Sequence, residues 1–155
     1  MTKRYRFTHS GFTTAAVEVV AEVVADADGW KRWARPMVLQ TELESWGADS
    51  AHGAGAIRRV GAPPVWIREM ILDWDPAVGQ VYTVLSPALF SHYRGEIAFE
   101  PTEFGGTHIR WTVEFVPRSR WLGNVLRAGF SAVIAQFIAR IVAHCDRLAV
   151  GAVAR

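Results

Sequence analysis

The chain has 155 residues, of which half are hydrophobic and 21% are charged, and its formal net charge is +2. This length and composition predict one globular domain over residues 1–155 and exclude a disordered or fibrous chain. The chain has 17 basic and 15 acidic residues, and no basic run exceeds two residues, so the composition does not favour nucleic-acid binding.

The single cysteine, Cys145, excludes an internal disulfide and fits a reducing compartment. Residues 1–10 lack the apolar centre of a signal peptide. The longest apolar stretch, residues 131–144, is broken by Gln136 and Arg140 and is too short to span a bilayer. We therefore expect a cytoplasmic protein without a membrane span.

The first third of the chain predicts a strand, two helices and a second strand. Residues 4–11 alternate between apolar and polar side chains, which predicts a half-buried strand. Thr13 or Thr14 is then expected to cap a helix that ends near Ala25. A turn and a second short helix are predicted over residues 26–35, followed by a second strand over residues 37–46.

The region from Gly53 to Pro117 predicts five strands joined by tight turns, with no helix between them. These strands are expected at residues 56–60, 65–74, 80–85, 93–100 and 107–116. From Trp121 to about Val150 the pattern becomes helical, with an apolar stripe and, on another face, Arg140, His144 and Arg147. The stripe consists of Leu122, Leu126, Phe130, Val133, Phe137, Ile141, Cys145 and Leu148. The fold class is therefore α+β, a curved antiparallel sheet wrapped around a C-terminal helix.

Several short motifs accompany this order of elements. They are DADGWKRWARP from Asp26, HGAGAIRRV from His52, REMILDWDP from Arg68, HYRGEI from His92 and GGTHIRWTVEF from Gly105. In order and spacing they resemble the START-like superfamily, also called SRPBCC, and in particular its bacterial polyketide cyclase/dehydrase-type members. The resemblance implies a helix-grip fold, in which a seven-stranded sheet and the long helix enclose a deep pocket. Relatives bind lipids, sterols, hormones or polyketides in that pocket, and a minority carry out chemistry there.

An empty, dry pocket of this kind would be costly. An apolar cavity of about 300 Å³ would cost about 7 kcal/mol, which is comparable to the stability of a whole domain. A ligand, water or large side chains must therefore fill it. Alternation in the last two strands points Tyr93 and Trp111 toward the long helix, and aromatic rings with a polar tip often contact ligands.

Alternation alone does not decide which face of residues 65–74 is buried, but the resemblance favours Glu69 and Ile71 pointing inward. Together with the resemblance, the pattern gives a set of candidate ligand-binding residues. The set is Trp33, Arg58, Glu69, Ile71, Tyr82, Tyr93, Trp111, Phe130 and Phe137.

A buried ion pair is the clearest candidate for chemistry. If residues 61–64 centre the hairpin, Arg58 lies opposite Glu69 and the two side chains pair. The pair could orient a carbonyl or carboxylate of a ligand, with Arg58 donating, or it could be a structural cross-strand bridge. Glu69, Arg58 and Tyr82 are the candidate catalytic residues.

The histidines do not predict a metal site, because no two have a ligand spacing on one helix, and no cofactor is implied. His52 and His92, in or beside loops, could act as an acid or base, although a solvated loop histidine is more typical. His144 is expected to be exposed.

Three functions remain open. The first is a carrier or sensor that binds a hydrophobic small molecule, and the second is a polyketide cyclase, aromatase or dehydratase-type enzyme that uses the same cavity. The third is an interaction module with a filled core, for example a homodimer formed through Trp66, Trp74 or Trp121.

Overall fold

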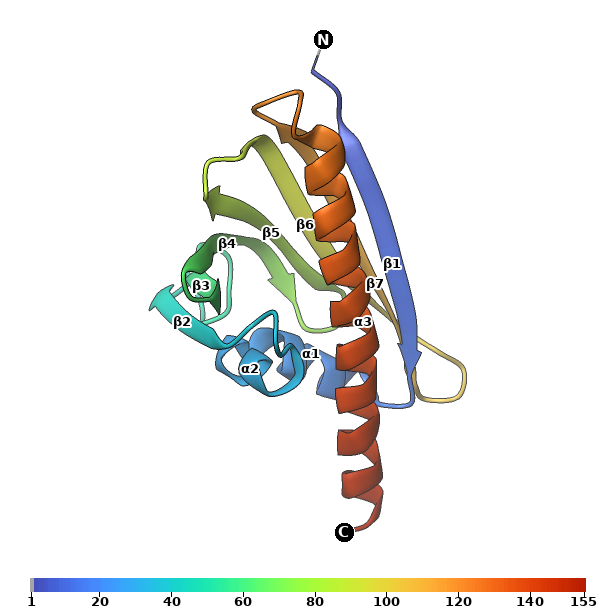
Figure 1. Cartoon of the computed structure of the whole chain (residues 1–155). Helices are drawn as coiled ribbons and strands as arrows, with labels where there is room; N and C mark the ends of the chain where they lie inside the picture. Colours follow the sequence, from blue (N-terminus) through green and yellow to red (C-terminus); the bar gives the residue numbers. More distant parts are fainter. Residues whose placement is uncertain (1) are drawn as a thin grey trace.

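The computed structural model describes residues 2–155 and contains one sheet, one long helix and a short helical segment (Figure 1). The chain runs through strand β1 (Tyr5–Thr13), helix α1 (Val17–Ala25), a 3-10 turn (Ala27–Gly29), helix α2 (Trp30–Trp33), strands β2 (Gln40–Ser45), β3 (Ile57–Ala62), β4 (Val65–Asp75), β5 (Gly79–Ser86), β6 (Phe90–Pro101) and β7 (Thr107–Pro117), and helix α3 (Gly123–Val153). The predicted order of a strand, two helices, six strands and a long helix is confirmed.

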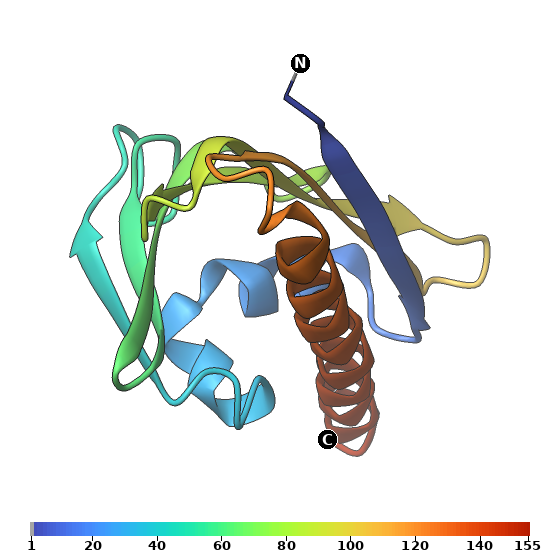
Figure 2. The same ribbon diagram turned by 45° about the horizontal axis from the view of Figure 1, so that its top comes forward.

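The seven strands form one antiparallel sheet in the order β1-β7-β6-β5-β4-β3-β2. Strands β2 to β7 are consecutive neighbours, whereas β1 pairs with β7 from the other end of the chain. The sheet curves around α3, while α1 and α2 lie across its open side (Figure 2). This arrangement is the helix-grip fold that the resemblance implied.

Alternating side chains hold the sheet against α3. In β7, Ile109, Trp111, Val113 and Phe115 are almost completely buried, as their alternation predicted. The neighbouring strand β6 needs a glycine between its buried residues, because a Cβ at Gly95 would lie 2.2 Å from the ring of Tyr82. Close packing between the central strands therefore excludes any side chain at that position.

The buried face of α3 differs in part from the predicted stripe. Phe137, Ile141 and Cys145 are buried as expected, whereas Leu122 and Leu148 are exposed because they lie near the ends of the helix, where less of the protein covers them. Ile134 and Ile138 complete the buried face instead. Burial raises the pKa of the Cys145 thiol to about 12, so this cysteine is a core residue rather than a nucleophile.

The prediction that Thr13 or Thr14 caps α1 is wrong. Helix α1 has Ala16 at its N-cap without a side-chain hydrogen bond. Both threonines instead bind Asp146 of α3, with the Thr13 hydroxyl donating over 2.6 Å and the Thr14 amide over 2.9 Å. These hydrogen bonds, of which the one from Thr13 has the largest effect, hold the pKa of Asp146 below its usual value. They also connect the end of β1 to α3.

An irregularity in β4 changes which residues face inward. Glu69 and Ile71 point inward, but the pairing with β5 shifts between Ile71 and Asp73. After this bulge, Trp74 packs against the buried Phe99, with ring centroids 6.3 Å apart. Simple alternation along β4 therefore does not hold beyond Ile71.

Helix α3 meets the length and composition of a membrane-spanning helix, with a mean hydropathy of 1.6 over 18 residues, of which 17% are buried. The apolar stretch is thus longer than the sequence analysis allowed. However, Ile134, Ile138 and Ile141 on its inner face cover the core of the sheet. The packing therefore gives α3 the role of a core helix.

Candidate functional site

A cavity of about 320 Å³ lies between the sheet and the first half of α3. Glu69, Tyr82, Tyr93 and Trp111 line it from the sheet. Further lining comes from Trp30, Met37 and Val38 on one side and from Phe130, Val133, Ile134 and Phe137 of α3 on the other. Val65, at the tip of the β3–β4 hairpin, also lines the cavity and is 64% exposed, so the cavity reaches the surface there.

The structure brings six of the nine candidate ligand-binding residues to this cavity. They are Glu69, Tyr82, Tyr93, Trp111, Phe130 and Phe137. The other three do not line it: Trp33 packs behind Trp30 and Phe137, Ile71 is in the core, and Arg58 lies beneath aromatic rings. A role of these residues in binding stays a prediction.

Sequence reasoning missed several lining residues, of which Trp30 is the most important. It stands three positions before Trp33, and both rings pack edge-on against Phe137. A helical turn of this length carries no signal that separates the ring at the cavity from the ring behind it. Val60 and Ile67, which face each other across the β3–β4 hairpin, could have been found from the same register that pairs Arg58 with Glu69.

A buried polar network lies beside the cavity on three adjacent strands. Arg58 Nε donates to Glu69 Oε2 over 2.8 Å, and Arg58 Nη2 donates to Gln80 Oε1 over 3.1 Å. The register places Arg58 directly opposite Glu69, which confirms the predicted pairing. All three residues are buried, so the network can persist only because its charges and donors satisfy one another.

Aromatic rings cover the guanidinium of Arg58. Its central carbon lies 4.3 Å from the centroid of the Trp30 ring and 5.7 Å from that of Tyr82. With two hydrogen bonds already made and rings on its surface, Arg58 is not positioned to donate to a ligand. The geometry favours the structural bridge for Arg58, while the Glu69 side chain remains at the cavity wall.

Two tyrosines supply neutral hydroxyl groups. Burial, and after it the negative charge of Glu69, raises the pKa of Tyr82 far above its usual value. The pKa of Tyr93 is raised by burial, then by Tyr82 and Glu69. The Trp111 indole Nε1 donates to the Tyr82 hydroxyl over 3.0 Å. Because an indole can only donate, this bond leaves the proton of Tyr82 free to donate to another acceptor.

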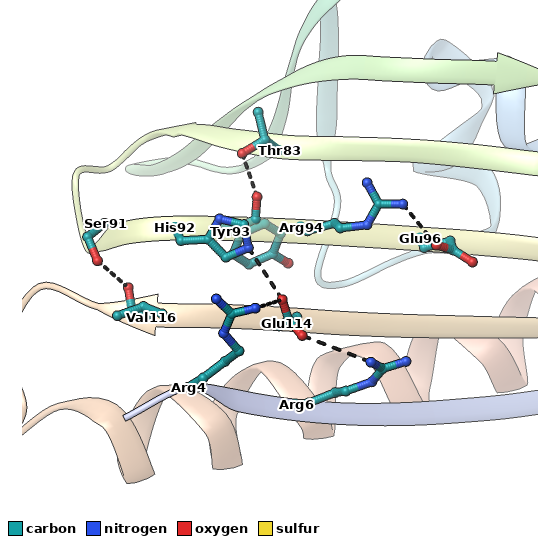
Figure 3. Close-up of polar contacts among 10 residues, drawn as sticks. All are labelled: Arg4, Arg6, Thr83, Ser91, His92, Tyr93, Arg94, Glu96, Glu114 and Val116. Atoms are coloured by element: carbon teal, nitrogen blue, oxygen red, sulfur yellow. Dashed lines mark hydrogen bonds and ion pairs between the residues drawn. The ribbon is translucent and has the colours of Figure 1, made fainter. Parts of the chain in front are cut away.

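The histidines do not approach this cavity. His92 lies on the face of the sheet away from α3, 3.5 Å from Glu114 (Figure 3), so it is not placed to act as an acid or base in the cavity. His52 and His144 line a separate hollow between α1, α2 and α3. His144 is half-buried rather than exposed, and burial, then Arg147 and Arg32, lowers its pKa. Among residues 2–155, no cluster of histidine, cysteine or acidic side chains is arranged to hold a metal ion.

These features define a helix-grip protein of the START-like class, with an apolar cavity between the sheet and the long helix. The sequence matches the family described as polyketide cyclase/dehydrase and lipid transport over residues 4–146. The chain therefore belongs to that family. No curated protein matches it.

Solved structures with the same fold come from bacteria and plants. The Zhui aromatase/cyclase of a Streptomyces species has a TM-score of 0.77 and 18% identity, covering 94% of this chain and 95% of that one. A norcoclaurine synthase from Thalictrum has a TM-score of 0.75 and 15% identity, covering 94% of this chain and 96% of that one. A START superfamily protein from Mycobacterium smegmatis has a TM-score of 0.75 and 10% identity, covering 92% of this chain and 98% of that one. At these identities, the likeness shows the fold alone.

Proposed function

We propose that the chain is a cytoplasmic carrier or sensor that binds one hydrophobic small molecule, lipid-like or polyketide-like, in the cavity beside α3. The observation that carries this proposal is the lining. Aromatic and aliphatic side chains form almost all of it, and Glu69, Tyr82 and Tyr93 supply the few polar groups. A cavity of about 320 Å³ is at the lower end of the size range for small-molecule sites.

The polar groups favour a particular kind of ligand. The Tyr82 hydroxyl is neutral and retains a free proton, so it suits a carbonyl or hydroxyl oxygen. A ligand carboxylate placed here would lie near Glu69, and the positive charge of Arg58 is already engaged. We therefore expect neutral, mainly apolar ligands with one or two oxygen atoms.

Binding can be tested with N-phenyl-1-naphthylamine, a neutral apolar dye that fluoresces when it leaves water. The wild-type chain is expected to bind it in a saturable way, and native mass spectrometry should show the same one-to-one complex. Val133→Phe, which adds a ring inside the cavity, should abolish binding, whereas Ala132→Phe on the exposed side of α3 should not. Equal binding by both variants would contradict a ligand in this cavity.

A second candidate function is catalysis by the same cavity, favoured by the carboxylate of Glu69 at its wall. A carboxylate there could take the acidic proton from the carbon between two carbonyl groups of a polyketide-like chain. The resulting enolate would attack a second carbonyl carbon, and loss of water would complete an aldol-type cyclisation. Tyr82 would donate a hydrogen bond to the oxygen on which negative charge develops.

Glu69→Gln separates the two functions, because glutamine retains the bond from Arg58 but cannot accept the proton. If the chain is an enzyme, this variant should lose turnover of a poly-β-ketone substrate and still bind the dye. Equal turnover by wild type and variant would remove Glu69 from the mechanism, and no turnover by the wild type would leave the carrier function.

A further inference from the structure

Charge is distributed unevenly along the chain. Residues 118–155 carry six arginines and one aspartate, whereas residues 1–117 carry 11 basic and 14 acidic residues. The net charge of +2 thus combines a basic C-terminal part with an acidic remainder. Asp146, the one acidic residue of the basic part, accepts hydrogen bonds from Thr13 and Thr14. Within residues 2–155, no acidic side chain forms an ion pair with any of the six arginines.

The side of α3 that faces away from the sheet combines exposed apolar side chains with a few polar and basic ones. Large exposed apolar side chains stand at both ends: Trp121, Leu122 and Val125 at and just before the start, and Val150 and Val153 at the end. Between them five exposed positions are small, namely Ala128, Gly129, Ala132, Ala139 and Ala143, and the other exposed positions are Arg127, Gln136, Arg140, Arg147 and Leu148. This pattern explains how α3 can have a mean hydropathy of 1.6 with so little of it buried. The exposed Arg140 and Arg147 lie on the same side.

The two ends of this surface have features suited to a lipid interface. Trp121 is 79% exposed, and the guanidinium of Arg120 lies 4.6 Å from its ring. Tryptophan and arginine side chains settle where lipid headgroups meet hydrocarbon, the ring in the apolar layer and the charge on phosphate. At the other end, Val150 and Val153 are 69% and 88% exposed on the last turns of α3, which extend beyond α1 and α2 (Figure 1).

Charge complementarity identifies the occupant of this surface. A symmetric dimer through this face would place arginines against arginines, because the exposed side of α3 offers no acidic residue to receive them. An anionic bilayer suits both the basic and the apolar side chains of this surface, since lipid phosphates pair with the arginines and the headgroup layer accepts the apolar side chains. The helix would lie on the bilayer rather than cross it, because its inner face covers the core.

We propose that Trp121 and the outward face of α3 together dock the protein on an anionic lipid surface. Trp121, Val150 and Val153 enter the headgroup layer, and Arg140 and Arg147 contact phosphates. This surface is separate from the cavity and does not depend on its ligand.

Vesicle flotation tests the electrostatic part. The wild-type chain should float with vesicles of phosphatidylcholine and phosphatidylglycerol, less so at high salt, and only weakly with phosphatidylcholine alone. Each arginine at an anionic surface contributes about fivefold to binding, so Arg140→Glu with Arg147→Glu should weaken it by about 25-fold or more. The matched control is Arg6→Glu with Arg94→Glu, which makes the same charge change on the opposite face of the sheet (Figure 3) and should retain binding.

A second pair of variants tests insertion. Val150→Asp with Val153→Asp should also prevent flotation, while circular dichroism shows an unchanged fold, since both positions are exposed. Equal binding to both kinds of vesicle, binding unaffected by the aspartates, or equal losses in the arginine variant and its control would each overturn the proposal. So would light scattering that shows a wild-type dimer which the α3 variants dissociate, because that face would then belong to a second copy.

Discussion

Removal of Glu69 alone should destabilise the protein more than removal of the whole ion pair. In the Glu69→Leu variant, Arg58 keeps its charge at 3% exposure, and its Nε loses the partner 2.8 Å away, so that only the bond to Gln80 remains. Loss of one partner of a buried pair costs about 3–5 kcal/mol, because the remaining charge is desolvated without compensation. We therefore expect the free energy of unfolding to fall by about that amount.

The double variant Arg58→Met with Glu69→Leu removes both charges and should recover most of this loss, since apolar replacement of a buried pair is often close to neutral. Urea denaturation of the wild type, both single variants and the double variant gives the coupling energy directly. A cost below about 1 kcal/mol for Glu69→Leu would match an exposed surface pair and would refute the buried network.

Three other perturbations test packing, pH dependence and reactivity. Gly95→Ala should cost about 1–3 kcal/mol in urea denaturation, because the new Cβ meets the Tyr82 ring; an unchanged midpoint would contradict this contact. Asp146, whose pKa is lowered in the fold chiefly by the Thr13 bond, contributes stability above its unfolded pKa that is lost as the pH falls through the folded pKa. The melting temperatures of wild type and Asp146→Asn should therefore differ at neutral pH and converge in acid, and a constant difference would be inconsistent with this linkage. Cys145, buried and with a pKa of about 12, should react with a disulfide reagent such as Ellman's only after unfolding; rapid labelling of the native protein at pH 8 would disprove this.

Alternation and turn position were sufficient to predict much of the sheet and the ion pair. In β7 the inward set follows directly from every second residue, since no bulge interrupts the strand. The pairing of Arg58 with Glu69 follows from the centre of one hairpin. Both predictions depend on local regularity, which a single sequence records well.

Prediction failed where contacts join segments that are distant in the sequence or where regularity ends. The bulge after Ile71 reverses the direction of Trp74, and no residue in REMILDWDP marks it. Gln80 reaches Arg58 across β4, so its role could not follow from one hairpin alone. Thr13 has the residue type of a helix cap, but Asp146, which is 133 positions away, offers a stronger acceptor.

The pairing of β1 with β7 also constrains how the protein folds. Among the described residues 2–155, residues 5–13 find all their strand partners at residues 107–115, so β1 has no partner strand until almost three quarters of the chain exists. The hairpins from β2 to β7 close short loops and can form early, whereas the closure of β1 brings together distant segments. During synthesis on a ribosome, the apolar side of β1, with Tyr5 and Phe7, would therefore remain exposed to solvent until most of the chain has been made. The step that completes the sheet is therefore the step at which a nascent chain is most exposed to misassembly.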